Sequence, residues 1–592
     1  MIITLDFETY YDDEYSLRKM TTEEYVRDPR FVCHGLAIKF DGYAAQWATP
    51  ATLRADWLRN QIEQSACLAH HAQFDGLILN HHFGIRPRLW LDTLSMARIA
   101  LPHERHSLDN LGKLFGLGGK KHEHLTDVKG VRSPNAAMLA GLGTMSCDDA
   151  DKTYAIFQQI RESIPKEEFR IIDATIRMFT EPVLRLDEPK MRVYYTKVCA
   201  DKADALQELG LTKKDLGQDE VVAAKLRELG VEPEVKTTGK GNEKYAFAKT
   251  DQFMRDLLED ADERVSSLAA ARLGIKSSLR ETRCARLLSM STRGAMAVYL
   301  RYCGAHTTRW SGGDSLNWQN FVPEIKGSIE APPGHVVVVA DSAQIECRMV
   351  NWLGGQWDVI EMFRQKRDPY VVQASQFYGR TITRADKVER HLGKTIELGC
   401  GFGMGAERFK ITCANGPLGG APIYLSLAEA KQAVDIYRST HPAVKSMWYG
   451  IAEDVLECLA QRRSMTWGPL EIDDGAVWLP NGLPLWYDDP KLDANGDRWF
   501  LVRGRRSKMY GGKLVENVVQ ALARVILSQA MLRVMDRYRI VTCTHDEIAC
   551  VVPIDKGQEA LDFVLSVLKQ SPEWGPNLPL DAEGFTGVRY SK

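Results

Sequence analysis

Two apolar, β-branched stretches, far apart in the chain, each end at an acidic residue. Residues 335–340 (HVVVVA) have the pattern of a buried strand, and Asp341 follows them directly. Residues 539–552 form two similar runs joined by THDE, which predicts a β-hairpin with Asp546 near its tip. Hard cations such as Mg²⁺ take oxygen ligands, and a pair of such ions can drive phosphoryl transfer. These two strand ends, in a chain that also begins MIITLDFETY, therefore indicate carboxylates that hold divalent metal ions.

The composition is that of a globular protein but does not by itself indicate a function. At 592 residues the chain is too long for one hydrophobic core, and about three to four domains are expected. Hydrophobic residues make up 44% and charged residues 26%, as in ordinary soluble proteins. The net charge of −2 and the pI near 6.7 give no overall basic character. A nucleic acid partner would therefore have to meet local clusters of Lys and Arg.

Cysteine spacing and the N-terminal sequence bear on the cellular location. The twelve cysteines include no CxxC pair, which argues against a zinc site and against a disulfide scaffold. The chain enters an apolar strand at once, without a basic signal-peptide region, and no apolar run is expected to reach the length of a transmembrane helix. We therefore expect a cytoplasmic protein that has no membrane partner.

Sequence patterning divides the chain into three regions. Residues 1–160 alternate strand-like and helix-like patterns, which predicts an α/β unit. A charge-rich, mostly helical region runs from 164 to about 290, and strands are mixed with long helical stretches after it. The polar segment 235–244 interrupts the helical region and is most simply a solvated turn. The segment KKHEH that starts at Lys120 is likewise most simply an exposed loop.

The segment 390–403 predicts a helix with a basic stripe. Steps of four residues advance about 400° around an α-helix. One face therefore carries Arg390, Lys394, Leu398 and Phe402. Cations at one end and apolar side chains at the other suit a triphosphate and its base. An ordinary amphipathic helix is the simpler alternative, and a dinucleotide-binding loop at GCGFGMG is disfavoured because no strand leads into it.

Five segments together resemble the motifs of family A DNA polymerases, the DNA polymerase I type. DSAQIECR at 341–348 is similar to motif A, the RxxxK and FG of 390–403 to motif B, and THDE at 544–547 to motif C. TRWSG and NWQN, within 308–320, resemble the TGRxS…NxQN stretch, and ENVVQ at 516–520 resembles the ENxxQ helix. All five occur in the family's order, so chance is a poor alternative. The chain most resembles compact phage-encoded members.

The resemblance implies an α/β and α+β multidomain fold, in which an RNase H-like exonuclease domain precedes a right-hand polymerase domain of thumb, palm and fingers. The expected bounds are 1–160 for the exonuclease, 161–295 for the helical thumb and 296–592 for the palm and fingers, with the fingers at approximately 355–475. The implied function is a template-directed DNA polymerase that adds deoxynucleotides to a primer 3′ end by two-metal nucleotidyl transfer. A 3′–5′ proofreading exonuclease and a role in replicating phage DNA are implied with it.

The resemblance assigns a role to each polymerase motif. Asp341 and Asp546 would hold two Mg²⁺ ions, which Mn²⁺ could replace, and Glu547 would be a supporting acid. Arg390 and Lys394 would neutralise the phosphates of the incoming deoxynucleoside triphosphate. The nucleotide pocket would be formed by Arg390, Lys394, Glu346, Leu398, Phe402 and Tyr370.

Several pocket residues depart from the family pattern. Glu346 would be the steric gate that excludes a 2′-hydroxyl, but Phe402 replaces the tyrosine that can bond to the gate. Glu346 must therefore find another partner, because an unpaired buried charge is costly. Leu398 stands where an aromatic residue usually stacks near the sugar. Tyr370 replaces a phosphate-binding histidine and brings a hydroxyl without a positive charge.

Primer–template DNA is the macromolecular partner that the resemblance implies. The implied DNA-binding residues are Arg309, Asn320, Gln520, His545, Lys236, Lys240 and Lys244. Arg309, Gln520 and His545 would contact the primer terminus or its minor groove. The three lysines of the polar segment would lie on the thumb, over the duplex, rather than on a solvated turn. Processivity or replisome proteins are candidate partners as well.

A second acidic cluster is predicted from the N-terminal part of the chain. Asp6 and Glu8 lie two residues apart on the first predicted strand, so both side chains point to the same face. With Asp75 in HHAQFDG and Asp149 in CDDADK, they resemble the 3′–5′ exonucleases of the DEDD class. The implied chemistry is two-metal hydrolysis of the terminal phosphodiester, with these four acids as the metal ligands.

The N-terminal cluster departs further from its family than the polymerase motifs do. His71 stands where the family has an asparagine, and Met145 stands four residues before Asp149, where a tyrosine normally orients the water. Asp148 and Asp151 are rival choices for the fourth acid. The identities of the fourth acid and of the water-orienting group therefore stay open.

Two other functions fit part of the pattern. A single-subunit RNA polymerase would share the metal aspartates, but Glu346 argues against it. A catalytically inactive DNA-binding accessory subunit is the non-enzymatic alternative, and the intact metal aspartates with Arg390 and Lys394 argue against that.

Overall fold

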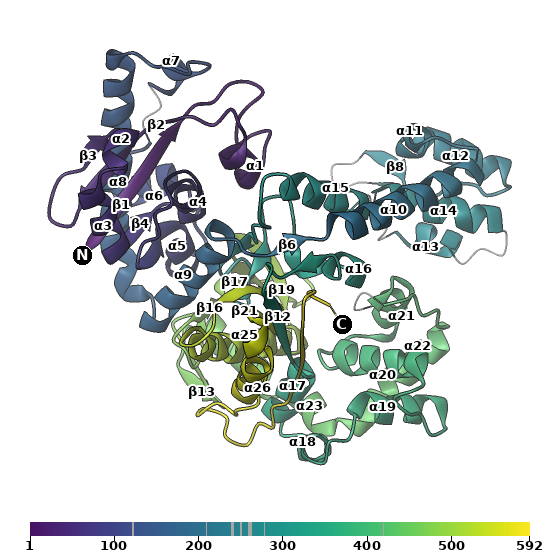
Figure 1. Cartoon of the computed structure of the whole chain (residues 1–592). Helices are drawn as coiled ribbons and strands as arrows, with labels where there is room; N and C mark the ends of the chain where they lie inside the picture. Colours follow the sequence, from purple (N-terminus) through teal and green to yellow (C-terminus); the bar gives the residue numbers. More distant parts are fainter. Residues whose placement is uncertain are drawn as a thin grey trace. The chain divides into compact units, whose positions relative to one another are not determined.

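The protein is described from a computed structural model that covers residues 1–120, 124–208, 210–237, 242–248, 251–258, 263–276, 279–417 and 420–591. Lys240 of the expected DNA-binding set lies outside the described residues. The chain divides into two compact units (Figure 1). Unit 1 comprises Met1–Leu184, Ala295–Phe321 and Glu330–Lys592, and unit 2 comprises Arg185–Gly294 with Val322–Ile329.

The N-terminal part of unit 1 is built on a mixed five-stranded sheet with the order β3–β2–β1–β4–β5. Its strands are β1 (Ile2–Thr9), β2 (Cys33–Phe40), β3 (Gln46–Ala48), β4 (Ala66–Ala69) and β5 (Leu89–Asp92). The central strand β1 pairs antiparallel with β2 and parallel with β4. Ile3, Leu5 and Phe7 of β1 are buried, so the alternation of side chains along a strand places Asp6 and Glu8 together on the other face.

Helices of the N-terminal part pack against this sheet and against one another. They are α1 (Thr22–Arg27), α2 (Pro50–Leu53), α3 (Asp56–Gln64), α4 (Ala72–Phe83), α5 (Thr93–Ala100), α6 (Leu108–Leu114), α7 (Leu125–Val128), α8 (Ala136–Ile160) and α9 (Lys166–Thr180). The long helix α8 runs along β1 and β2, and α4 packs against α9. α4 also contacts β1, so both α4 and α8 pack against the strand that carries Asp6 and Glu8.

The C-terminal part of unit 1 contains a four-stranded antiparallel sheet with the order β20–β21–β12–β22. Its strands are β12 (His335–Ser342), β20 (Ile540–Thr544), β21 (Glu547–Pro553) and β22 (Ala582–Gly587). The β-branched run of β12 is buried between β21 and β22, as the predicted apolar strand requires. Short strands β9 (Leu300–Arg301) and β10 (Ser311–Gly312) pair with each other in the same unit.

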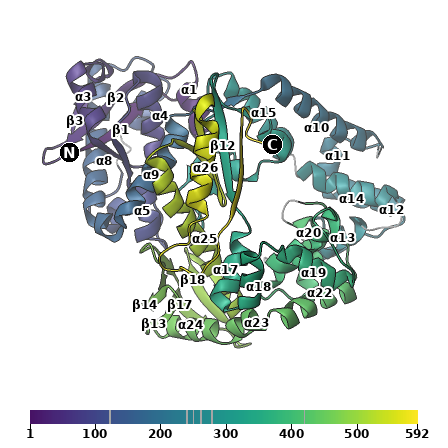
Figure 2. The same ribbon diagram turned by 60° about the horizontal axis from the view of Figure 1, so that its bottom comes forward.

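Two long helices cover this antiparallel sheet. α25 (Gly511–Met535) and α26 (Gly557–Leu568) pack against each other, and α26 lies along β12 (Figure 2). By length and composition α25 could cross a membrane, contrary to our expectation that no apolar run reaches that length. However, 72% of its apolar window is buried inside the protein. A buried core helix passes the same test, so α25 is weak evidence for a membrane span.

A helical segment separates β12 from the other strands of its sheet in the sequence. Its helices are α17 (Ile345–Gly354), α18 (Trp357–Arg364), α19 (Pro369–Tyr378), α20 (Lys387–Cys400), α21 (Ala406–Ala414), α22 (Leu427–Thr440), α23 (Pro442–Tyr449) and α24 (Ile451–Ala460). The small sheets that follow contain β13 (Met465–Trp467), β14 (Leu470–Asp473), β15 (Ala476–Trp478) and β16 (Pro484–Trp486), then β17 (Asp488–Leu492), β18 (Arg498–Val502) and β19 (Arg505–Met509). α20 packs closely against α19.

The helix expected at 390–403 ends earlier than predicted. α20 stops at Cys400, so the basic stripe does not continue to Phe402 on the same helix. The Gly401 carbonyl accepts a hydrogen bond from Trp448 Nε1 at 3.0 Å. Gly403 adopts a φ of +81°, a left-handed conformation that glycine reaches without steric cost. These two features turn the chain directly after the helix.

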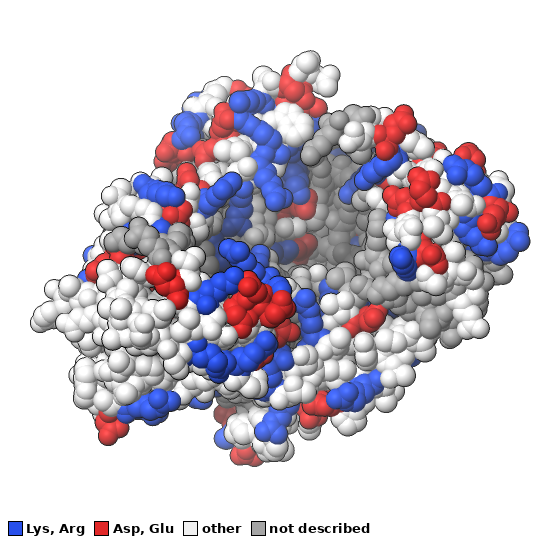
Figure 3. Space-filling view, turned by 90° about the horizontal axis from the view of Figure 1, so that it is seen from above, with Lys and Arg blue, Asp and Glu red and all other residues white. Residues whose placement is uncertain are grey.

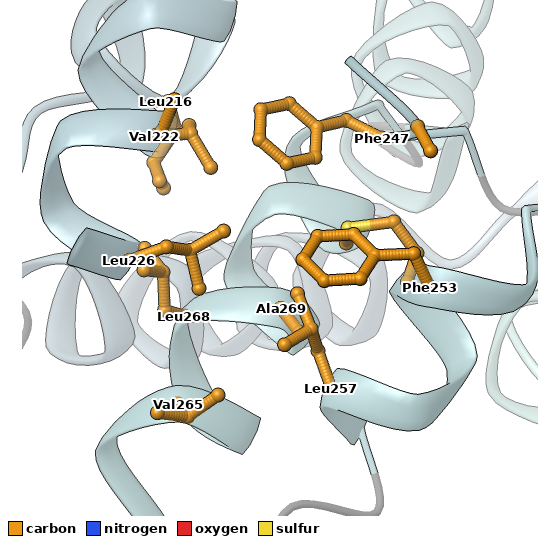
Figure 4. Packing of buried hydrophobic residues seen from close by; sticks show 12 residues of the cluster. Leu216, Val222, Leu226, Phe247, Phe253, Leu257, Val265, Leu268 and Ala269 are labelled. Carbon is orange, nitrogen blue, oxygen red and sulfur yellow. The ribbon is translucent and has the colours of Figure 1, made fainter. Parts of the chain in front are cut away.

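Unit 2 is mainly helical and has a core of its own. Its elements are α10 (Glu188–Glu208), α11 (Lys213–Gly217), α12 (Asp219–Glu228), α13 (Gln252–Leu258), α14 (Glu263–Lys276), α15 (Leu279–Ser291), α16 (Pro323–Lys326), β7 (Val235–Thr237) and β8 (Glu243–Tyr245). Buried side chains of the short helices, including Leu216, Val222 and Leu268, pack around Phe247 and Phe253 (Figure 4).

The polar segment of unit 2 is more ordered at its described ends than a simple solvated turn. β7 and β8 pair antiparallel, with Lys236 opposite Lys244. Lys236 forms a close ion pair with Asp251. Its charge is therefore partly satisfied within unit 2.

A buried ion pair connects the two parts of unit 1. Arg524 of α25 donates to both carboxylate oxygens of Glu168 on α9, at 2.6 and 2.7 Å. Tyr302 Oη and Asn481 Nδ2 donate to the same carboxylate at 2.6 and 2.8 Å. Each of these donors comes from a distant segment, so the pair fixes α9 against α25.

We expect Arg524→Met to lower the free energy of unfolding by about 3–5 kcal/mol, because it leaves the buried carboxylate of Glu168 without its cation. Urea unfolding followed by tryptophan fluorescence measures this loss. The matched control is Arg170→Met, which removes the exposed ion pair between Arg170 of α9 and Asp536 at the end of α25. That control should change stability much less. Equal losses in the two variants would show that the buried pair does not hold these helices together.

Candidate active sites

Two neighbouring strands bring the predicted polymerase acids together. In the antiparallel register, Asp341 of β12 faces Glu547 of β21. The Ser342 N–H donates to the Asp546 carbonyl at 3.1 Å, which fixes the hairpin turn against the end of β12. His545 adopts a φ of +55° in this turn. The result is a row of carboxylates along one end of the sheet.

The electrostatics of this row favour a bound cation. The pKa of Asp546 is raised to about 8 by burial, with smaller contributions from the negative charges of Asp341 and Glu346. Arg309 acts in the opposite direction. Closely spaced carboxylates supply the oxygen ligands that Mg²⁺ and Mn²⁺ prefer. The donor set therefore fits a divalent ion.

Glu547 and the hairpin are anchored by a tyrosine from near the C-terminus. Tyr590 is 2% exposed, and its hydroxyl donates a short hydrogen bond to Glu547. The same hydroxyl lies 3.2 Å from Thr544 Oγ1, on the other strand of the hairpin. Tyr590 thus holds both sides of the turn that carries Asp546, a contact that sequence motifs did not indicate.

Glu346 finds its partner in a segment that is distant in sequence. It lies in the first turn of α17, directly after the acidic end of β12. Arg309 Nη2 forms a close ion pair with Glu346. Phe402 has no hydroxyl to bond to Glu346, and the Arg309 guanidinium is the partner instead. The ion pair joins the predicted gate, Glu346, to a predicted DNA contact, Arg309.

Arg390, on the basic helix α20, forms an ion pair with Asp368, an acid that the sequence analysis missed. Arg390 Nε and Nη2 both lie 2.8 Å from Asp368 Oδ2. The guanidinium also sits over the ring of Tyr370, 5.4 Å from its centroid. Tyr370 is 3% exposed, so a buried aromatic ring packs against the Arg390 guanidinium. Lys394 lies one turn further along α20 and is partly exposed.

A cavity of about 690 Å³ lies beside these residues. Of the six residues predicted for the nucleotide pocket, Glu346, Leu398 and Phe402 line this cavity. Arg390, Lys394 and Tyr370 are not among its lining residues. The lining also includes Glu516 of the predicted ENxxQ helix and four residues that the sequence analysis did not select, namely Arg408, Lys508, Tyr510 and Lys513. Basic residues next to GG before the predicted ENxxQ helix were the available signal for Lys513. The cavity therefore combines an acid, apolar walls and cations.

A buried acid lies on α20 next to this cavity. Glu397 is 2% exposed, and burial raises its pKa to about 8. Cys347 Sγ donates to Glu397 Oε2 at 3.5 Å, and His441 Nε2 lies 3.5 Å from Glu397 Oε1. Burial lowers the pKa of His441 to about 4, so both groups are neutral near pH 6.

The remaining predicted DNA contacts are spread over the two units. Gln520 of α25 donates to Glu516 at 3.3 Å, and Asn320 ends the 3₁₀ helix η2 (Trp318–Asn320). Lys236 and Lys244 belong to unit 2. Figure 3 shows Lys and Arg side chains mixed with Asp and Glu on the visible face, several of them gathered near its middle. This distribution agrees with local rather than overall basic character.

Three elements bring the N-terminal acids together. Asp6 and Glu8 lie on β1, and the N–H of Phe7 between them donates to Asp75 Oδ1 of α4 at 3.1 Å. Ser146 Oγ of α8 donates to Asp6 Oδ2 at 2.8 Å. Asp149 lies one turn after Ser146 on the same helix and is fully buried. The structure thus places the four predicted acids in one cluster.

Burial and mutual repulsion raise the pKa of every acid in this cluster. Burial raises the pKa of Asp6 to about 6 and the pKa values of Glu8 and Asp75 well above their ordinary range. The pKa of Asp149 is raised as well, again mainly by burial. A divalent cation would stabilise the ionised form of these buried carboxylates, so this set of oxygen ligands also fits a divalent ion.

The rival acids on α8 point to other partners. Asp148 forms a close ion pair with Lys152, and Asp151 lies 2.8 Å from Lys39 Nζ. Asp149 faces Asp6 instead, because its charge is among those that raise the pKa of Asp6. The geometry therefore favours Asp149 as the fourth acid.

Lys120 is a cation at this cluster that the sequence analysis placed on an exposed loop. Its Nζ lies 2.7 Å from Asp149 Oδ2, and its side chain is 30% exposed. The expectation of an exposed loop is wrong for this residue, because the turn after α6 directs the side chain inward. The adjoining residues 121–123 lie outside the described chain.

The two departures from the DEDD pattern have structural roles. His71 adopts a φ of +74° at the start of α4, and its Nε2 lies 2.7 Å from Tyr299 Oη in the C-terminal part of unit 1. Met145 is buried with Val128 and Leu142. It brings no hydroxyl group to orient a water molecule.

Neither acidic cluster is a preassembled metal cage. Among the described residues, no three Asp, Glu, His or Cys side chains converge closely enough to form a ready metal site. The acids are close enough to repel one another but would need a cation to draw them together.

Comparison with known proteins identifies the polymerase segment. Residues 224–466 match the sequence family described as DNA polymerase family A. This segment, which is less than half of the chain, is similar to family A DNA polymerases. The resemblance drawn from the five motifs is confirmed at this level. The chain is also similar to the DNA polymerase of Bacillus phage SP02, with 29% identity over 283 residues, which cover 44% of this chain and 42% of that protein.

Bacterial relatives and a solved structure agree with this family. The thermostable DNA polymerase I of Thermus thermophilus is 24% identical over 269 residues, 44% of this chain and 27% of that protein. The chain spans less than half the length of these two curated relatives. A structure described as the POL domain of Pol1 from M. smegmatis in complex with DNA primer–template and dNTP has a TM-score of 0.70 at 16% identity. It covers 99% of this chain and 95% of its own, so the fold of the polymerase is shared over the chain.

We expect Glu397→Gln to change how stability depends on pH. The pKa of Glu397 is about 8 in the folded protein and near 4.5 when unfolded, so the folded state binds the extra proton between these values. Wild-type stability should therefore fall as pH rises from about 5 to about 8, by up to about 1.4 kcal/mol per pH unit from this group. Glu397→Gln should lack that slope. Urea unfolding at several pH values measures it.

Glu407→Gln, at an exposed position on α21, is the control and should keep the wild-type slope. If Glu397→Gln and wild type lose stability in parallel over this range, the raised pKa of Glu397 is refuted.

Proposed function

We propose that this chain is a template-directed DNA polymerase that extends a primer 3′ end with deoxynucleotides. The observation that carries the proposal is the row of strand-end acids beside a nucleotide-sized cavity. Asp341 and Asp546 lie at one end of the sheet, and Glu346, Leu398 and Phe402 line the cavity. The family match and the names of the relatives support the same activity.

In this proposal each polar residue has a task. Asp341 and Asp546 would hold divalent ions, Mg²⁺ or Mn²⁺, which would activate the primer hydroxyl and stabilise the leaving pyrophosphate. Arg390 and Lys394 would bind the triphosphate, and Asp368 would orient Arg390. Glu346, paired with Arg309, would stand where a 2′-hydroxyl would enter. Primer–template DNA and deoxynucleoside triphosphates are the proposed ligands, and the M. smegmatis polymerase domain binds the same two kinds of molecule.

We further propose that the N-terminal acids form a 3′–5′ exonuclease. Asp6, Glu8, Asp75 and Asp149 share one buried cluster on three elements of a mixed sheet domain. A divalent ion held there would activate water for hydrolysis of the terminal phosphodiester. The expected domain bounds (1–160, 161–295 and 296–592, with fingers near 355–475) remain proposals. So do proofreading, phage DNA replication, a cytoplasmic location and replisome partners.

Primer extension with Mg²⁺ tests both activities in one protein. We expect Asp546→Ala to abolish extension, because it removes an acid that would hold metal, while a primer 3′ end is still degraded. Asp6→Ala should have the opposite effect. Gel analysis of a labelled primer on a template, with and without deoxynucleotides, measures both.

Asp555→Ala, on the 3₁₀ turn after β21, is a control that should change neither activity. Primer extension by the Asp546→Ala variant would contradict the polymerase assignment. Degradation of the primer 3′ end by the Asp6→Ala variant would contradict the exonuclease assignment only.

We expect Glu346→Ala to weaken discrimination against ribonucleotides at least about ten-fold, because it removes the side chain in the path of a 2′-hydroxyl. The ratio of kcat/KM for a deoxynucleotide and its ribonucleotide measures this effect. Glu361→Ala, an exposed residue on the neighbouring α18, is the control. Unchanged discrimination in Glu346→Ala, or a preference of the wild type for ribonucleotides, contradicts the assigned gate and favours an RNA polymerase.

A further inference from the structure

Lys120 is a cation built into the N-terminal acidic cluster. Its Nζ lies 2.7 Å from Asp149 Oδ2, which is a direct ion pair with a fully buried carboxylate. This contact brings a cation from the turn after α6 directly to the acid on α8.

The turn that presents Lys120 is fixed on both sides of the residue. The Lys120 N–H donates to Asp109 Oδ1 at 2.9 Å. The preceding carbonyl, of Gly119, accepts from Lys152 Nζ at 2.7 Å. Lys152 is 5% exposed, and it is held in turn by Asp148 on its own helix. The inward position of Lys120 is thus a supported part of the fold and not a chance surface contact.

The ammonium and a divalent ion would compete for the same carboxylate. A metal ion bound to an Asp oxygen sits about 2.0–2.2 Å from it, and Mg²⁺ needs near-octahedral ligands around it. An ammonium 2.7 Å from Asp149 Oδ2 occupies that side of the carboxylate and would repel a second cation. Asp6 and Glu8 lie on β1 and Asp75 lies on α4. Asp75 Oδ1 accepts from the Phe7 N–H and Asp6 Oδ2 accepts from Ser146 Oγ, and a carboxylate has further lone pairs with which to bind an ion.

We propose that Lys120 takes the place of one of the two divalent ions, so that the N-terminal centre binds a single ion through Asp6, Glu8 and Asp75. This inference rests on the proposed exonuclease. Lys120 acts as a positioning residue that holds Asp149 in place and supplies positive charge where a second metal would lie. It also provides a polar group at a centre where Met145 has none.

Counting bound Mn²⁺ tests the inference directly. The parent protein is the full chain with Asp341→Asn and Asp546→Asn, so that the count reports the N-terminal centre. Electron paramagnetic resonance titration, with and without a deoxynucleoside monophosphate, should give one Mn²⁺ per chain. Lys120→Met should raise the count to two, and Lys120→Arg should keep it at one. Lys19→Met, which removes an exposed pair with Glu14, is the matched control and should keep one.

Thermal unfolding in EDTA gives a second measurement that does not depend on activity. Lys120→Met should lower Tm by roughly 3–6 °C, because the buried acids lose their internal cation. Saturating Mn²⁺ should restore more stability to Lys120→Met than to the parent. Lys19→Met should match the parent in both conditions.

The parent count decides the inference even if Lys120→Met does not fold. Two Mn²⁺ per parent chain would overturn the role of Lys120 and leave the exonuclease standing. No Mn²⁺ uptake, together with no loss of primer 3′ ends from the wild-type protein, would overturn both. An unchanged Tm for Lys120→Met in EDTA would also overturn it.

Discussion

Repulsion between carboxylates that the backbone holds close together is the constraint on which the rest of this structure depends. At both clusters the acids are fixed by backbone N–H groups, from Ser342 in one and from Phe7 in the other. Burial and neighbouring charge raise the pKa of Asp546 to about 8 and of Asp6 to about 6. Such an arrangement costs folding free energy unless cations offset it. Arg309 lowers the pKa of Asp546 at one cluster, and Lys120 pairs with Asp149 at the other.

Local periodicity predicted the elements that carry the acids. Alternation along a strand was enough to place Asp6 and Glu8 on one face of β1, and the β-branched run predicted β12 with Asp341 near its end. Helical periodicity alone does not show which acid of α8 faces the cluster. Three acids within four residues of α8 point in different directions, and only their partners, Lys152 and Lys39, separate Asp148 and Asp151 from Asp149.

Contacts between distant segments could not be predicted from the sequence. Arg309 with Glu346, Asp368 with Arg390, and Lys120 with Asp149 each depend on how separate elements pack, and no motif spacing encodes that. At the end of α20, the Gly401 carbonyl accepts a hydrogen bond from Trp448 of α23, which is distant in sequence. Residues 161–184 show the same limit, because their helical pattern did not reveal that they belong with unit 1.

The buried carboxylate of Glu168 has a kinetic consequence for the proposed pair of activities. This ion pair joins α9 to α25, and both acidic clusters belong to the same compact unit. In the proposed pair of activities, a strand end would have to move from one cluster to the other within this unit. The choice between adding and removing a nucleotide would then be set by how quickly the terminal base pairs open. Mispaired ends open sooner, so they would be removed preferentially.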